Sequence, residues 1–230
     1  MNTLGVIVAC GKEEEITSGT DAAFLSLGTM PMLVHSLRTF QNASSIDGII
    51  VAVAKDRVGT TLHAIKRYGC SKVCGVVVGG ASRLSTLRTV FAKMPEPASV
   101  VIIHEASRPF VTKIILGEIV KAAKRYGCAV AAHKIPDSVK LVPTGMKATK
   151  TLERNTIWAT QTPQAFKFEV LAKIIDTKIK PKDIKIIDDE SEFVRKPSEV
   201  HMVEVGSGNM KIRSSADLAI ATALLNANLT

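Results

Sequence analysis

The chain has 230 residues, of which 46% are hydrophobic but only one is Trp and two are Tyr. This length can bury an aliphatic core without disulfide or metal support, as in a buried parallel sheet. Lys and Arg exceed Asp and Glu by 30 to 21, a net charge of +9 that favours anionic ligands such as phosphates. Basic runs interleaved with aromatic residues are absent, so we expect no nucleic-acid binding. With no signal peptide and no membrane-spanning run, we expect a cytoplasmic protein without a membrane partner.

Short apolar runs alternate with segments of helical periodicity along the first 133 residues. The apolar runs predict buried strands at 4–10, 48–54, 72–78, 99–104 and 128–133. The periodic segments predict helices at 31–40, 58–68, 84–94 and 114–126. This alternation is typical of an α/β fold with a doubly wound, mostly parallel sheet of the Rossmann-like kind.

The alternation breaks between Pro136 and Pro163. Residues 137–142 and 150–154, on either side of a Pro-Thr-Gly turn, predict a polar hairpin inserted into the domain. Such an arm, at about 137–160, is too thin to fold alone, so we expect it to pack on another subunit. A helix, a strand and a last helix are then predicted at 166–175, 200–206 and 216–225. We therefore expect one domain over 1–230 with a dimerisation arm.

Polar clusters follow several of the predicted strands. In an open parallel sheet, ligands bind outside the carboxyl ends of the strands. The clusters at such ends are residues 11–21, 79–85, 104–108 and 137–140. Their convergence on one edge predicts the binding site.

The two middle clusters each allow two interpretations. The glycines of 79–85 let backbone approach a ligand while Ser85 hydrogen-bonds it, or the segment is an ordinary turn capped by Ser82. In the next cluster Glu105 could hold a magnesium ion, or Arg108 could be its structural ion-pair partner. For Lys211 the default interpretation is a solvated surface lysine, and its place in a loop that enters the last helix modestly favours phosphate contact.

Five segments together match a known pattern over nearly the whole chain. They are VVVGGASRLSTL (76–87), VIIHEASRPFV (101–111), TLERNTIWATQTPQAF (151–166), IIDDESEFV (186–194) and GNMKI (208–212). The sequence resembles the 2-C-methyl-D-erythritol 4-phosphate cytidylyltransferase family of the non-mevalonate isoprenoid pathway. Related ribitol-phosphate cytidylyltransferases share the fold but usually differ before QTPQ.

The resemblance implies transfer of CMP from CTP to a sugar-alcohol phosphate, with magnesium as cofactor, release of pyrophosphate and a homodimer joined through the arm. It also assigns roles by position. The nucleotide-binding residues would be Gly11, Gly80, Arg83, Ser85 and Arg108, and Glu105 would take the place of the metal-binding aspartate. Ser138 and Thr162 would bind the acceptor substrate, with Arg154 and Lys211 holding its phosphate.

The first loop departs from the family pattern. Aligned without a gap, residues 11–24 read GKEEEITSGTDAAF, so Glu15 stands at the catalytic arginine position and Ala22 at the catalytic lysine position. Because cations neutralise charge on transferring phosphates, these changes oppose catalysis, and Lys12 could compensate only in part. Two hypotheses follow: a cytidylyltransferase with a rebuilt loop, or a non-catalytic homologue that binds a nucleotide or sugar phosphate or serves as an interaction module.

Overall fold

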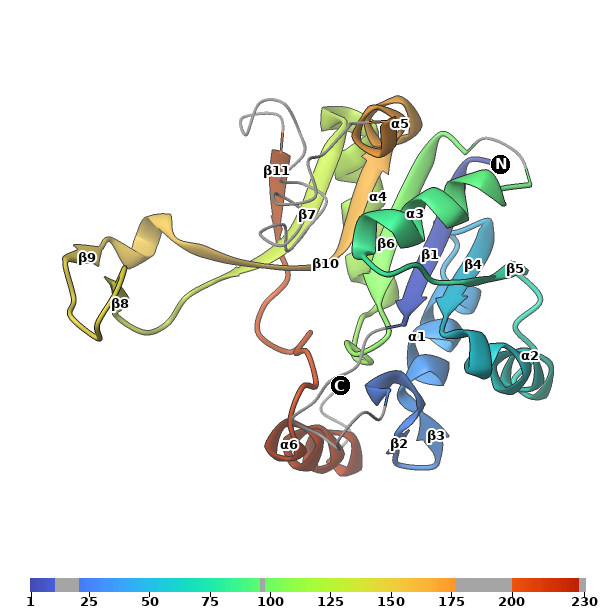
Figure 1. The fold of residues 1–230 in the computed structure, drawn as a ribbon, viewed down its shortest axis with the longest axis horizontal. Coiled ribbons are helices and arrows are strands. Elements are labelled where there is room, and N and C mark those ends of the chain that lie inside the picture. The colour runs from blue at the N-terminus through green and yellow to red at the C-terminus, as the bar shows by residue number, and fades with distance from the viewer. Residues whose placement is uncertain (11–20, 96–97, 177–199, 228–230) are drawn as a thin grey trace.

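A computed structural model describes residues 1–10, 21–95, 98–176 and 200–227 of the chain. Its main sheet has seven strands in the order β11-β7-β10-β6-β1-β4-β5 (Figure 1). All neighbouring pairs are parallel except the two that β10 makes with β6 and β7. The predicted α/β class with a mostly parallel sheet is confirmed.

The elements of the sheet and its helices fall close to the predicted segments. The strands are β1 (Thr3–Ala9), β4 (Gly48–Val53), β5 (Val73–Val78), β6 (Val100–Glu105), β7 (Cys128–Lys134), β10 (Trp158–Lys167) and β11 (Val200–Glu204). The α-helices are α1 (Met32–Asn42), α2 (Val58–Arg67), α3 (Arg83–Ala92), α4 (Lys113–Tyr126), α5 (Phe168–Asp176) and α6 (Ser215–Asn226). Short elements are η1 (Ala22–Phe24), β2 (Ser26–Leu27), β3 (Met30–Pro31), η2 (Lys55–Arg57) and η3 (Arg154–Thr156).

Helices cover both faces of the sheet, as the doubly wound prediction requires (Figure 1). One apolar core joins the sheet to α1 and α4 through residues such as Leu37 and Leu116. The other joins the opposite face to α3 and α5 through Leu87 and Ile174. Both faces of the sheet are therefore buried, which leaves the ends of the strands as the place where the fold exposes polar groups.

The sequence prediction missed β10, a ten-residue antiparallel strand in the middle of the sheet. Its segment contains Gln161, Thr162, Pro163 and Gln164, and Pro within a run argues against a central strand. The register of β10 against β7 shifts between Gln161 and Gln164. This irregularity accommodates the proline and points buried polar side chains toward one edge of the sheet.

The inserted arm is the hairpin of β8 (Val139–Leu141) and β9 (Lys150–Leu152). It projects well away from the sheet (Figure 1), and Met146 at its tip is 96% exposed. Across the described residues, helices of the length and apolarity needed to cross a membrane are absent.

Candidate active site

The carboxyl ends of β1, β5 and β6 surround a pocket of about 260 Å³. Its lining brings together residues from three of the four predicted clusters, among them Asp21, Gly80, Arg83 and Glu105. Cys10, Ala22, Thr86 and Lys211 also line it. These residues are far apart in sequence, and the parallel register of the strands brings them to one edge. The predicted location of the site is therefore where the structure has this pocket, which we call the nucleotide pocket.

The glycine turn before α3 forms one wall of the nucleotide pocket. A Cβ on Gly80 would lie 2.8 Å from the Cβ of Ser85, so the turn closes this tightly only with glycine. Ser82 caps α3 by accepting from the Ser85 amide at 3.2 Å, and the Ser85 hydroxyl accepts from the Ser82 amide at 2.8 Å. The structure thus has the helix cap that was one of the two interpretations of this segment, and nucleotide contact by Gly80 and Ser85 stays a prediction.

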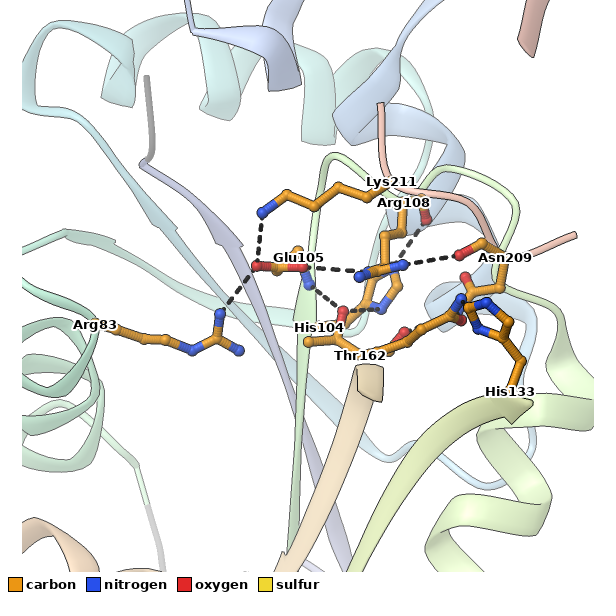
Figure 2. Close-up of polar contacts among 9 residues, drawn as sticks. Arg83, His104, Glu105, Arg108, His133, Thr162, Asn209 and Lys211 are labelled. Carbon is orange, nitrogen blue, oxygen red and sulfur yellow. Dashed lines mark hydrogen bonds and ion pairs between the residues drawn. The ribbon is translucent and has the colours of Figure 1, made fainter. Parts of the chain in front are cut away.

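Three cations converge on Glu105 (Figure 2). Its Oε1 accepts from Arg83 Nη1 at 2.9 Å and from Lys211 Nζ at 3.1 Å, while Arg108 Nε donates to Oε2 at 3.2 Å. The Glu105 side chain is only 16% exposed. Burial alone would raise the pKa of Glu105, but the charges of Lys211, Arg83 and Arg108 outweigh it and lower the pKa to about 2. The carboxylate is therefore ionised at any physiological pH.

This arrangement suits an anion better than a metal ion. Both carboxylate oxygens of Glu105 already accept from cations, and among the described residues its ion pairs join three positive side chains to one negative one. The described residues contain no group of three His, Cys, Asp or Glu side chains that could hold a metal. Within this part of the chain, a divalent cation at Glu105 would meet net positive charge, so this carboxylate does not fit magnesium as it stands.

A second pocket, of about 400 Å³, shares Arg83, Glu105 and Lys211 with the nucleotide pocket. We call it the acceptor pocket. Of its described lining residues, Arg83, Arg108, Lys211 and Arg213 are basic and Glu105 is acidic. Residues of β10 complete its lining. Because Arg83 and Lys211 line both pockets, two anionic groups could bind near the same cations.

Thr162 lies beneath this cluster and is 3% exposed. Its hydroxyl oxygen accepts from the Glu105 amide at 3.0 Å and lies 3.2 Å from Nδ1 of His104. His104 is fully buried, and burial lowers its pKa to about 4, so its ring is neutral at pH 7. Thr162 lines the acceptor pocket, but its hydroxyl is hydrogen-bonded within the protein, so contact with the acceptor stays a prediction.

The remaining predicted residues lie elsewhere. Ser138 and Arg154 are exposed at the base of the arm, and Arg154 Nη1 donates to the carbonyl of Pro136 at 3.0 Å. Neither residue lines the nucleotide pocket or the acceptor pocket, so substrate contact by either stays a prediction. Ala22 lines the nucleotide pocket and is 1% exposed. Gly11, Lys12 and Glu15 lie outside the described residues.

Sequence reasoning missed two residues that organise the site. Asn209 is 1% exposed, and its Nδ2 donates to Gln161 Oε1 and to the Thr162 carbonyl, each at 2.8 Å. Its own carbonyl accepts from Arg108 Nη1 at 3.0 Å. The motifs GNMKI and QTPQ contain both amides, but only the fold brings the two motifs together. The loop that carries Lys211 is thereby fixed against β10.

The sequence profile described as "IspD: 2-C-methyl-D-erythritol 4-phosphate cytidylyltransferase" matches residues 3–227. The chain belongs to this family. Among curated relatives, the 2-C-methyl-D-erythritol 4-phosphate cytidylyltransferase of Shouchella clausii is 34% identical over 226 residues, covering 98% of this chain and 97% of the relative. That of Syntrophus aciditrophicus is 33% identical, covering 96% and 95%.

Solved structures show the same fold. A 4-diphosphocytidyl-2C-methyl-D-erythritol synthase from Anaerococcus prevotii superposes with a TM-score of 0.83 at 24% identity, covering 98% of this chain and 96% of the other. The 2-C-methyl-D-erythritol 4-phosphate cytidylyltransferase from Thermus thermophilus does so with a TM-score of 0.73 at 23% identity, covering 96% and 98%. The family membership predicted from the motifs is confirmed.

Proposed function

We propose that this protein transfers CMP from CTP to 2-C-methyl-D-erythritol 4-phosphate and releases pyrophosphate. The observation that carries the proposal is the cation cluster of Arg83, Arg108 and Lys211, of which Arg83 and Lys211 line both pockets in a chain of this family. CTP would occupy the nucleotide pocket and the acceptor would occupy the acceptor pocket. The cations between them would bind phosphate oxygens from both.

The reaction joins two phosphates that repel each other. An oxygen of the acceptor phosphate forms a bond to the α-phosphorus of CTP, and the bond from that phosphorus to the bridging oxygen of the β-phosphate breaks. The electron pair of that bond leaves with pyrophosphate. Lys211 and Arg83 would reduce the repulsion as the phosphates approach, because they lie on the wall that the two pockets share. To contact a phosphate fully, both must weaken their ion pairs with Glu105.

Magnesium belongs to this proposal only as a partner of the triphosphate. When bound to a nucleotide, magnesium neutralises charge on the phosphates. Glu105 is engaged by three cations, so no step of the proposed reaction depends on a metal held by this residue. We expect the homodimer implied by the arm to supply Ser138 and Arg154 to the partner's acceptor pocket.

A second candidate is a non-catalytic homologue that binds a nucleotide or sugar phosphate. The observation that favours it is Ala22, a buried methyl group in the nucleotide pocket where the family pattern has a lysine. If this loss and Glu15 are what prevent turnover, the double variant Glu15→Arg with Ala22→Lys should raise CTP affinity and restore pyrophosphate release. Comparing the double variant with the unaltered protein thus distinguishes a substituted first loop from a protein that has lost its fold.

The test is titration of the purified full chain with CTP in a calorimeter, with magnesium present, followed by an assay of pyrophosphate release on addition of 2-C-methyl-D-erythritol 4-phosphate. Binding with release supports the enzyme. CTP binding without release, corrected by the double variant, supports the non-catalytic homologue. A folded protein that binds neither CTP nor the acceptor contradicts both candidates.

A further inference from the structure

We propose that His104 is a positioning residue, which closes a ring of hydrogen bonds that sets Glu105 and Arg108 at the boundary of the two pockets. This inference deepens the proposed function and rests on it. His104 is 0% exposed, so it can touch neither substrate. Any effect it has on ligands must pass through the residues that it holds.

The tautomer of His104 follows from its partners. Nε2 lies 3.0 Å from the carbonyl oxygen of Arg108, which can only accept, so Nε2 carries the proton. A neutral imidazole has one proton, and Nδ1 is therefore an acceptor. The group 3.2 Å from Nδ1 is the Thr162 hydroxyl, which must donate to it. Both nitrogens of the ring are thus used within the protein.

The hydroxyl of Thr162 is fixed by the same logic. Its proton points to His104, so its oxygen presents a lone pair to the Glu105 amide, which donates at 3.0 Å. The backbone of Glu105 is therefore held by β10 at the point where its side chain meets the cations. A rotated hydroxyl would turn its proton toward the amide proton of Glu105 and lose this bond.

Four hydrogen bonds form a closed cycle through His104, Arg108, Asn209 and Thr162 (Figure 2). His104 donates to the carbonyl of Arg108, whose Nη1 donates to the carbonyl of Asn209 at 3.0 Å. The Nδ2 of Asn209 donates to the carbonyl of Thr162 at 2.8 Å, and Thr162 returns to His104. This ring ties together the end of β6, strand β10 and the loop that carries Lys211. Because a buried and satisfied network permits few alternatives, moving one member should displace the cations.

If His104 acted through packing alone, its substitutions would affect phosphate binding differently than if it acted through the ring of hydrogen bonds. The His104 ring also lies against Phe40, with centroids 5.6 Å apart. In His104→Phe an aromatic ring of similar size keeps this contact and removes both hydrogen bonds. In His104→Gln the amide can still donate to the Arg108 carbonyl but leaves Thr162 without its acceptor. Phe40→Leu is the matched control, because it changes the packing against His104 and leaves the ring of bonds intact.

The experiment measures affinity for inorganic phosphate by calorimetry and the tautomer of His104 by nitrogen-15 NMR, on the full chain. We expect the Nε2–H tautomer at pH 7 and a loss of phosphate affinity of about tenfold in His104→Phe. His104→Gln should recover part of that loss. Phe40→Leu should melt at a lower temperature and bind phosphate as the unaltered protein does.

Unchanged phosphate affinity in His104→Phe, or an Nδ1–H tautomer in the unaltered protein, overturns the inference. If His104→Phe does not fold, the inference is tested by the tautomer of the unaltered protein and by the phosphate affinity of His104→Gln. Failure of the proposed function looks different, because it is an absence of pyrophosphate release with the ring intact. If the unaltered protein binds no phosphate, exchange of the Glu105 amide decides: faster exchange in His104→Gln supports the inference, and unchanged exchange overturns it.

Discussion

The cation cluster around Glu105 and the arm both carry residues assigned to the acceptor, yet they are built in opposite ways. Glu105 is 16% exposed and held by residues from three separate segments of the chain. The arm has two strands of three residues each, and Leu141 is 46% exposed. The cluster is thus complete in one chain, whereas the arm has almost no core of its own.

The comparison shows which parts of the site a single chain can organise. Arg83, Arg108 and Lys211 are positioned by the sheet and by buried hydrogen bonds, so their geometry does not need a second subunit. Arg154 lies in η3 at the base of the arm, is exposed, and donates to the Pro136 carbonyl. We therefore expect changes in the cluster to alter chemistry and stability, and changes in the arm to alter association.

Lys211→Met should give the largest effect. It removes a cation from the wall between the two pockets, and loss of one such contact to a transferring phosphate costs on the order of 10³ or more in rate. The measurement is kcat/KM for pyrophosphate release with CTP and the acceptor. Lys124→Met, an exposed lysine on α4, makes the same change in charge and should leave the rate as it is. Equal rates for Lys211→Met and Lys124→Met would place the chemistry elsewhere.

Glu105→Gln should lower stability and raise anion affinity together. Removing the carboxylate takes away the partly buried charge that three cations share, which we expect to cost about 3 kcal/mol in the free energy of unfolding. The same change removes the internal competitor for Arg83 and Lys211, so phosphate should bind about tenfold more tightly. Urea unfolding and phosphate titration measure the two effects. Weaker phosphate binding in this variant would show that Glu105 supports the anion instead of competing with it.

Acid should destabilise the protein through His104. Its pKa is about 4 in the folded chain against an ordinary value of 6.5, so between these values the unfolded chain binds a proton that the folded chain does not. The contribution of the neutral His104 to the free energy of unfolding is therefore complete above pH 6.5. It is lost as the pH falls toward 4, by about 3 kcal/mol in all. Urea unfolding at several pH values measures this. Subtracting the same series for His104→Phe removes the other titrating groups, and a difference independent of pH would contradict the assignment.

Much of the fold could be predicted because the spacing of apolar residues indicates the helices and the buried strands. Residues 48–53 and 100–103 are continuous apolar runs, and the polar clusters that follow four of the predicted strands were expected to meet at one edge of a parallel sheet. Strand β10 could not be predicted in the same way. Its buried Gln161, Thr162 and Gln164 serve the site instead of the core, so they hide the apolar pattern of a central strand.

The sequence predicted which residues form the site but not which of them contact one another. Glu105 and Arg108 were each given two roles from sequence, and the structure shows them as an ion pair at 3.2 Å. The Glu105 carboxylate also pairs with Arg83 and Lys211, residues 22 and 106 positions away. The position of Lys211 depends on Asn209 and β10, contacts between segments that no local pattern contains.

The arm should give the smallest change in the stability of the single chain. Leu141 and Val142 are 46% and 43% exposed, so the pair Leu141→Asp and Val142→Asp should change the free energy of unfolding of a subunit by no more than about 0.5 kcal/mol. If the arm packs on a second copy, the same two charges should convert a dimer to a monomer in analytical ultracentrifugation, because they would be buried without partners. The acceptor KM should then rise while CTP affinity stays, since Ser138 and Arg154 would be lost from the partner's pocket. Replacing two exposed apolar residues far from the arm, Leu62 and Ile220, with Asp should leave the dimer unchanged. A dimer that survives the arm variant would mean that the two subunits meet through another surface, and that the acceptor pocket is complete in one chain.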